Sequence, residues 1–356
     1  MELIMDDLLR DLLIVDGVSG YEENISKIIE YNLSHICNNN VVRDTLGNVI
    51  GTLKLGKCTK KIMITAHMDE IGMVVKYINE HGFIRFIKVG GINNSILPGK
   101  KVEIINKKNE HIIGIIGVKP PHIMNDNDSK YQLKSEDMFI DVGMTSKEQA
   151  SKFIDIGDPI IFEPQAGILY ESIHYGKAVD NRIGCYIMIK VLEQLVNKHD
   201  LNLEICACAT VQEEVGLKGG HTAAFNINPD FALIIDTTIA GDTPEIKKET
   251  SSLKLGAGVA ITILEACGRG AIITSKVRNF ILNLARSNDI SYQIDIIDGG
   301  MTDATSIQLI KSGVLSGILS VPTRYIHAPI SVFDINDVQS TIMIATKIIE
   351  QIRLLL

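Results

Sequence analysis

The chain has 356 residues, of which 46% are hydrophobic and 22% are charged, and its formal net charge at pH 7 is -8. This length accommodates one large domain together with a smaller one or an insertion. The acidic balance argues against a nucleic-acid or an anionic-membrane partner, because either would need a basic face on the protein.

The first residues, from Met1 to Asp7, contain no cationic segment and no small-residue cleavage pattern, so we expect no signal peptide. No apolar run reaches the ~20 residues that a membrane-spanning helix needs. Both features favour a cytoplasmic protein.

The six cysteines are scattered and are expected to be buried thiols rather than disulfides. Cys206 and Cys208 would share one face of a strand, but they lack a second ligand pair at zinc-finger spacing.

The amino-terminal part of the chain predicts packing helices followed by a hairpin. Apolar positions at helical spacing predict a helix over residues 4–15, which residues 17–20 break before a second helix near Glu22. Residues 41–55 alternate around a Leu-Gly-Asn turn and predict a hairpin. A strand over residues 61–66 then ends abruptly at a polar cluster.

Residues 74–164 have a different character. Short β-like runs are separated by Gly, Pro and Asn/Asp clusters, which predicts a small β barrel or sandwich with a single helical candidate at residues 146–153. This stretch contains no cluster of metal-ligand type. We therefore interpret it as a domain inserted between two parts of one catalytic domain, residues 1–73 and 165–356.

Strands and helices alternate after Asp180, which predicts an α/β domain whose central sheet is mostly parallel and is flanked by helices on both faces. In such sheets ligands gather at the carboxyl ends of the strands. The expected helices are residues 182–196, 275–288, 304–311 and 335–356, and the expected strands are residues 203–211, 231–235, 253–263, 293–297 and 314–321.

Five polar stretches could converge at this edge of the sheet. Four follow predicted strands and one precedes a predicted helix. Imidazole and carboxylate are the ligands that a hydrolytic metal such as zinc takes where thiolates are absent. The pattern therefore predicts two divalent metal ions with open coordination positions, held by residues within 65–70, 179–182, 212–214, 235–236 and 324–327.

Each of these residues also has a purely structural interpretation. A lone histidine such as His67 is more often a surface or core residue than a ligand, but Asp69 lies where a carboxylate can orient a metal-bound imidazole. Asp180 could be a helix N-cap. Glu213 and Glu214 would repel each other unless a cation or a shared proton offset their charges, and at a strand end they would point in opposite directions.

Three further features of the sequence point less specifically to the site, or not to it at all. The loop at residues 299–304 is interpreted equally well as a plain turn with an N-cap or as a wall of the site. The eleven methionines are expected to fill the core. Six histidines lack a comparable acidic context and are expected to be ordinary surface or core residues, namely His35, His81, His111, His174, His199 and His221.

Seven motifs in a specific order and spacing extend over nearly the whole chain, at residues 17–22, 67–72, 119–122, 177–182, 212–216, 300–304 and 324–327. Through them the chain resembles the M42 family of cobalt- or zinc-dependent metallo-aminopeptidases, also called tetrahedral or glutamyl aminopeptidases and cellulase M-like. The resemblance implies a zinc-exopeptidase-like fold with an inserted domain that serves oligomerisation and substrate access.

The resemblance also implies a ligand set. Asp180 would bridge two divalent ions, which would be zinc or cobalt, with manganese as a further option. His67 and Asp236 would complete one metal site, and Glu214 and His327 would complete the other. The family has a cis peptide bond after the bridging aspartate, which corresponds to Asp180–Asn181 in this sequence.

Glu213 would be the general base, and Asp69 would support His67. Two ions would polarise the scissile carbonyl and lower the pKa of a bridging water, while Glu213 would take the water's proton and later deliver one to the leaving amine.

The implied substrates are peptides, which would be cleaved after their first residue. The implied partner is a second copy of the chain, in a homo-oligomer up to a dodecamer, with His122 near a neighbouring subunit's site. Met301, where relatives usually have glycine, would reshape the substrate pocket.

Three alternative functions remain beside this one. Another metal-dependent amide hydrolase, such as a deacylase, could use the same ligands. A glycosidase would need flanking carboxylates and aromatic platforms, which fits poorly with a chain that has no tryptophan. A non-catalytic peptide-binding assembly protein is the third alternative, and the presence of every site residue in acidic or imidazole form argues against it.

Overall fold

The computed structural model describes residues 5–120, 122 and 133–356. The remaining positions include Ile4 of the predicted first helix and Pro121 of the motif at residues 119–122, which lie outside the described residues. The chain falls into two compact units. One, here called the sheet unit, contains the chain up to Asp69 together with Gln165–Ile326 and Ile330–Leu356. The other, here called the barrel unit, contains Glu70–Pro164 and His327–Pro329.

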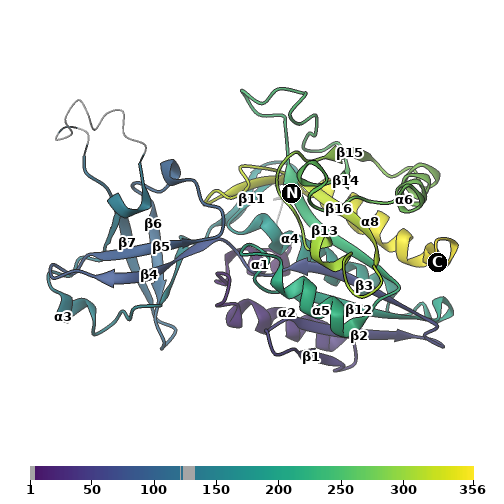
Figure 1. The fold of residues 1–356 in the computed structure, drawn as a ribbon, viewed down its shortest axis with the longest axis horizontal. Helices are drawn as coiled ribbons and strands as arrows, with labels where there is room; N and C mark the ends of the chain where they lie inside the picture. Colours follow the sequence, from purple (N-terminus) through teal and green to yellow (C-terminus); the bar gives the residue numbers. More distant parts are fainter. Residues whose placement is uncertain (1–4, 121, 123–132) are drawn as a thin grey trace. The chain divides into compact units, whose positions relative to one another are not determined.

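A mixed sheet forms the centre of the sheet unit (Figure 1). Its main path runs β1-β2-β12-β3-β13-β16-β17-β11-β10, and β14 and β15 extend from β16. The strands are β1 (Val41–Arg43), β2 (Val49–Leu55), β3 (Lys60–His67), β10 (Ala166–Tyr170), β11 (Ile173–Gly176), β12 (Leu203–Thr210), β13 (Phe231–Ile239), β14 (Val259–Leu264), β15 (Tyr292–Ile296), β16 (Leu315–Arg324) and β17 (Ser331–Asp334).

The four central strands β12, β3, β13 and β16 run parallel, whereas the outer pairs β1–β2, β16–β17 and β10–β11 are antiparallel. The central strands are almost continuously apolar because helices cover both of their faces. Their parallel direction brings their carboxyl ends to one edge of the sheet. The register places Thr210 beside His67, and Asp236 beside Ser320.

The helices of the sheet unit are α1 (Asp7–Ile14), α2 (Glu23–Ile36), α4 (Val179–Leu195), α5 (Lys218–Ile227), α6 (Ser275–Ser287), α7 (Ala304–Ile307) and α8 (Ile335–Gln351). Helix α4 is apolar around most of its circumference, as expected of a helix buried on several sides. It packs against β3, β13 and α8, whereas α5 packs against β12, β3 and α7. Among the described residues, no helix is both long enough and apolar enough to cross a membrane.

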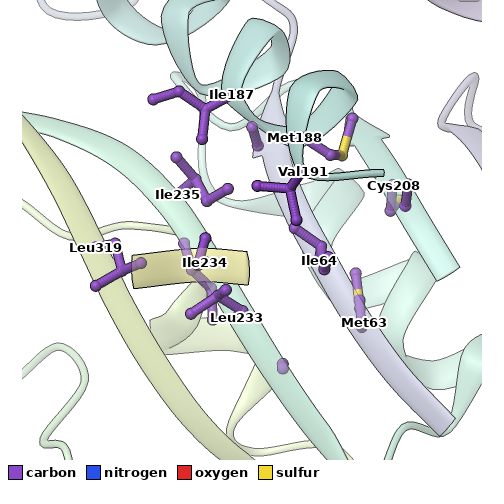
Figure 2. Close-up of a cluster of buried hydrophobic side chains, with 14 of the residues drawn as sticks. Met63, Ile64, Ile187, Met188, Val191, Cys208, Leu233, Ile234, Ile235 and Leu319 are labelled. Carbon is purple, nitrogen blue, oxygen red and sulfur yellow. The ribbon is translucent and has the colours of Figure 1, made fainter. Parts of the chain in front are cut away.

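The core of the sheet unit lies where α4 crosses the central strands. Figure 2 shows Ile187 and Val191 of α4 beside Ile64 of β3 and Ile235 of β13, and all four side chains are fully buried. Burying each such side chain contributes about 1.5–3 kcal/mol. Gly184 permits the close approach of α4 to β3, since a Cβ there would lie 3.0 Å from the Cβ of a strand alanine, Ala66.

In the described residues of the barrel unit, six antiparallel strands form a closed barrel in the order β4-β5-β8-β7-β6-β9. They are β4 (Gly72–Ile78), β5 (Ile84–Val89), β6 (Lys101–Ile105), β7 (His111–Gly117), β8 (Phe139–Asp141) and β9 (Pro159–Phe162). The predicted helix at residues 146–153 is a single turn, α3 (Lys147–Ala150), which is capped by the Ser146 side chain. The barrel encloses its own apolar core, so the prediction of a small β barrel is confirmed.

Several predicted boundaries were wrong for identifiable reasons. The strand expected over residues 253–263 begins only at Val259, because the loop before it is fixed by Asp337, which accepts hydrogen bonds from the backbone of Gly256 and Gly258. The helix expected over residues 304–311 ends at Ile307, and Lys311 has a positive φ of 53°. The expectation of buried cysteines fails for Cys58 and Cys267, although all six cysteines are free thiols.

We predict that Ile187→Ala lowers the free energy of unfolding by about 2–5 kcal/mol, because it leaves a cavity between α4 and the sheet. Thermal and chemical unfolding of the two proteins measure the difference. Met343→Ala in α8 is the control, since that side chain is 49% exposed and its loss should change the stability by less than about 0.5 kcal/mol. Equal stability of the Ile187→Ala variant and the parent would contradict the packing described here.

Candidate metal centre

His67 is the last residue of β3 and is almost fully buried. Sequence analysis placed it just after the strand, but the pairing with Thr210 of β12 keeps it within the ladder. Successive strand residues point to opposite faces of a sheet. Because Ala66 faces α4, the imidazole of His67 is directed to the opposite face.

Asp180 reaches this imidazole from the start of α4. Asp180 and Asn181 have non-helical backbone angles within the first turn, and the peptide bond between them is cis, as predicted. Asn181 is fully buried and holds this turn in place, since its Nδ2 donates to the carbonyl of Ile235 and its Oδ1 accepts from the backbone N–H of Gly184. Ala178, rather than Asp180, occupies the N-cap position.

Asp236 completes a compact group with His67 and Asp180. It was expected to follow its strand, but β13 continues to Ile239, so Asp236 lies within the ladder. The Nε2 atom of His67 is 3.2 Å from Asp180 Oδ1 and 3.7 Å from Asp236 Oδ1. One ligand atom from each of the three residues lies within 4.8 Å of the others. An imidazole and two carboxylates at this spacing are a suitable donor set for a zinc-type divalent ion.

The hydrogen bonds of His67 determine which nitrogen faces this group. Its Nδ1 lies 3.2 Å from the backbone carbonyl oxygen of Asp69. A carbonyl oxygen only accepts hydrogen bonds, so Nδ1 carries the proton. In the neutral imidazole, the lone pair of Nε2 is then directed at Asp180 and Asp236, which is the tautomer that a metal ligand requires.

The electrostatics of the group favour a bound cation. Burial alone would lower the pKa of His67, but Glu213, Asp180, Asp236 and Asp69 outweigh it and raise that pKa well above its usual value. Burial raises the pKa of Glu213 and that of Asp236, and the imidazole only partly offsets this. Several carboxylates crowded around a single imidazole are unfavourable unless positive charge is supplied. A divalent ion would supply that charge and displace the imidazole proton.

Asp69 lies beside His67 and has a second set of partners. Its carboxylate lies 3.5 Å and its backbone carbonyl oxygen 3.2 Å from Nδ1 of His67. The carboxylate itself accepts from the backbone N–H of Glu213 at 3.0 Å and of Glu214 at 3.2 Å, and from the Ser19 hydroxyl at 2.6 Å. Burial would raise the pKa of Asp69, but His67 and these hydrogen bonds lower it below its usual value.

Glu213 and Glu214 lie in a turn after β12, which ends at Thr210. The sequence predicts that they lie at a strand end and point in opposite directions, and this is wrong because the strand ends before them. Glu213 is 9% exposed, and its Oε2 lies 3.9 Å from Nε2 of His67. Glu214 is partly buried. The base expected from the sequence is thus at the same sheet edge as His67, Asp180 and Asp236.

His327 belongs to the short segment His327–Pro329 of the barrel unit. It has a positive φ of 61°, and its Nδ1 lies 3.0 Å from the carbonyl oxygen of Gly91 in the same unit. Its role as a metal ligand stays a prediction of the family resemblance.

Sequence analysis missed the buried acid Glu265. It accepts hydrogen bonds from the hydroxyls of Thr302 and Thr305 and so fixes the loop that contains Met301, whose own side chain is 46% exposed. Asp303 in the same loop accepts from the Thr210 hydroxyl at 2.6 Å, and burial raises its pKa to about 7. No helix periodicity or strand-end rule marks a loop glutamate of this kind.

The chain resembles known proteins over nearly its whole length. The M42 glutamyl aminopeptidase family matches residues 47–344. A putative aminopeptidase of Acetivibrio thermocellus is 37% identical over 345 residues, which cover 97% of this chain and 98% of the relative.

Two solved structures share the fold. Aminopeptidase APDkam598 of Desulfurococcus kamchatkensis has a TM-score of 0.92 at 38% identity and covers 97% of this chain and 94% of its own. The structure titled PhTET1-12s, a dodecamer, has a TM-score of 0.84 at 31% identity, with 97% of this chain and 98% of that chain covered.

We predict that His67→Ala weakens divalent metal binding at least ~100-fold, because it removes the imidazole ligand of the group. Metal content after dialysis, measured by inductively coupled plasma mass spectrometry, and titration calorimetry test this. His174→Ala is the matched control, since His174 is a buried histidine of β11 that stacks on Phe333. Equal metal content in the two variants would exclude His67 as a ligand.

Proposed function

Because the chain belongs to the M42 family of glutamyl aminopeptidases and is therefore a peptide hydrolase, we propose that it removes the amino-terminal residue of peptides with two divalent metal ions and Glu213 as general base. The observation that carries this proposal is the convergence of His67, Asp180 and Asp236 at one sheet edge, with the Glu213 carboxylate 3.9 Å from the same imidazole.

In this proposal Asp180 would serve both of two ions. His67 and Asp236 would complete the first position, which the spacing of their ligand atoms supports. Glu214 and His327 would complete the second position, which rests on the resemblance to the family. When bound, the ions would polarise the scissile carbonyl and lower the pKa of a water molecule. Zinc or cobalt suits this mixture of imidazole and carboxylate ligands, and manganese is a third choice.

Glu213 takes the proton from the attacking water and gives one to the leaving amine. Burial, together with Asp236, Asp303 and Glu214, favours the protonated form of the carboxyl, and His67 opposes this. A base of this kind needs its carboxylate beside the reacting water and a pKa near the working pH. The turn that contains it is held by Asp69 through two backbone hydrogen bonds, so the main chain that carries the carboxylate is held before a peptide binds.

The substrates are peptides, and the structure titled PhTET1-12s is a dodecamer. We propose that this chain also forms a homo-oligomer, in which the barrel unit supplies contacts and His122 lies near a neighbouring subunit's site. The exposed side chain of Met301 then contributes to substrate choice, because its loop is fixed at Thr302 by Glu265 while the methionine itself stays accessible.

We predict that Glu213→Gln retains bound metal and lowers kcat by roughly 10²- to 10⁴-fold, because the amide cannot accept the water's proton. Glu214→Gln is the paired variant, and it should lose metal as well as activity because it alters a proposed ligand. Metal analysis and steady-state kinetics separate these outcomes. A near-normal kcat for Glu213→Gln would show that another group is the base.

The metal requirement and the substrate class are tested together. We expect a panel of aminoacyl chromogenic substrates to be cleaved, activity to disappear after chelation, and zinc, cobalt or manganese to restore it. Peptides with a blocked amino terminus serve as the control, and they should resist cleavage. Full activity of the chelated, metal-free enzyme, or cleavage of blocked peptides at the same rate, would contradict the proposed reaction.

A further inference from the structure

The loop between α1 and α2 contains two buried polar side chains that the proposed reaction does not use. They are Ser19, which is 6% exposed, and Glu22, which is 8% exposed. Both lie in a motif through which the chain resembles its family, but the resemblance assigns them no role. Their hydrogen bonds lead to the turn at residues 212–214, which follows β12 about 190 residues later in the sequence.

Three successive backbone N–H groups of that turn each donate to a carboxylate. The N–H of Gln212 donates to Glu22 Oε1 at 3.2 Å, and the N–H groups of Glu213 and Glu214 donate to Asp69 at 3.0 and 3.2 Å. Two acids from separate segments thus hold the backbone of the proposed base and of the residue on each side of it.

Ser19 and Glu22 attach their loop to Asp69 and to the turn at residues 212–214. The Ser19 hydroxyl donates to Asp69 Oδ2 at 2.6 Å, the same oxygen that accepts from the N–H of Glu214. Glu22 Oε1 accepts from the N–H of Gly20 at 2.7 Å, in addition to that of Gln212. The loop is therefore bound to Asp69 by one side chain and to the turn by the other.

The turn needs this support because the backbone conformation of one of its residues is energetically unfavourable. Gln212 has a φ of 54°, in the left-handed region that residues other than glycine seldom occupy. Such a conformation persists only where surrounding interactions determine it. The carboxylates of Glu22 and Asp69 supply these interactions at the strained residue and at the two that follow it.

We propose that Ser19 and Glu22 are positioning residues that, through Asp69 and the turn at residues 212–214, fix the carboxylate of Glu213 for proton transfer. This inference rests on the proposed role of Glu213 as general base. Neither residue touches the reacting atoms. Their contribution is to geometry, and small displacements of a reacting group have large effects on rate.

We expect Ser19→Ala and Glu22→Met each to lower kcat by roughly 10- to 100-fold while KM, metal content and melting temperature stay close to those of the parent protein. Glu22→Gln should retain most of the parent's kcat, because its side-chain carbonyl oxygen can still accept from the N–H groups of Gly20 and Gln212. The control is Ser26→Ala, since among the described residues the hydroxyl of this buried serine donates only to the carbonyl of Glu23 within α2.

Hydrogen exchange gives a readout that does not depend on the loaded enzyme. In metal-free protein, peptides covering residues 212–214 should exchange faster in Ser19→Ala and Glu22→Met than in the parent or in Ser26→Ala. Glu22→Met removes the acceptor of the Gln212 N–H, and Ser19→Ala removes the hydroxyl that holds Asp69, the acceptor of the other two N–H groups. Unchanged exchange together with an unchanged kcat would overturn the inference. So would a loss of kcat that merely follows a loss of metal or of folded protein.

The two proposals fail in different ways. If Glu213→Gln keeps a near-normal kcat, the proposed base is wrong. If Glu213→Gln loses kcat but Ser19→Ala does not, only the positioning role is wrong. In a Glu213→Gln background, Ser19→Ala should cause little further loss, because residues that act through one group are not additive. A full second loss in the double variant would show that Ser19 does not act through Glu213.

Discussion

Negative charge crowded into a buried space is the constraint on which this site depends. Asp180, Glu213 and Asp236 each place a carboxylate oxygen within 3.9 Å of one nitrogen of His67. Burial makes such a group unfavourable unless positive charge is close. The imidazole of His67 can supply such charge, and the surrounding carboxylates accordingly raise its pKa well above its usual value. The arrangement is thus suited to a cation, and the fold must supply enough stability to hold the ligands together before one binds.

Some of the ligands are held by strands of the sheet, and the others by hydrogen-bonded segments next to the strands and helices. His67 and Asp236 are strand residues, and the parallel register of the central sheet fixes their distance. Asp180 lies in the irregular first turn of α4 and Glu213 in the turn after β12, so side-chain hydrogen bonds hold these segments. Asn181 does so for the first of these segments. Asp69, supported by Ser19, does so for the second. Rigid strands and bonded turns together determine the site.

The sequence allowed the convergence of the site to be predicted but not its supports. The sequence shows apolar runs that stop beside His67 and near Asp236. Parallel strands bring such ends to one edge of a sheet, so the two side chains are expected to lie together. The same runs end the strands too early, by one residue in β3 and by four in β13, since the hydrogen-bond ladders extend beyond the apolar stretches to His67 and Ile239. The sequence predicts a strand end rather than a turn at residues 212–214, because nothing in its composition marks the positive φ of Gln212. Partners such as Ser19 and Glu265 depend on long-range contacts that no local pattern encodes.

The hydrogen bonds of Asp69 explain why this residue cannot be regarded simply as the partner of His67. An ionised carboxylate has about four acceptor positions, and here three of them receive the N–H groups of Glu213 and Glu214 and the hydroxyl of Ser19. Nδ1 of His67 lies 3.2 Å from the backbone carbonyl oxygen of Asp69 and 3.5 Å from its carboxylate. One residue therefore fixes the ligand tautomer with its main chain and the base-containing turn with its side chain. Because both functions meet in Asp69, the placement of the metal ligand and the placement of the base are mechanically linked.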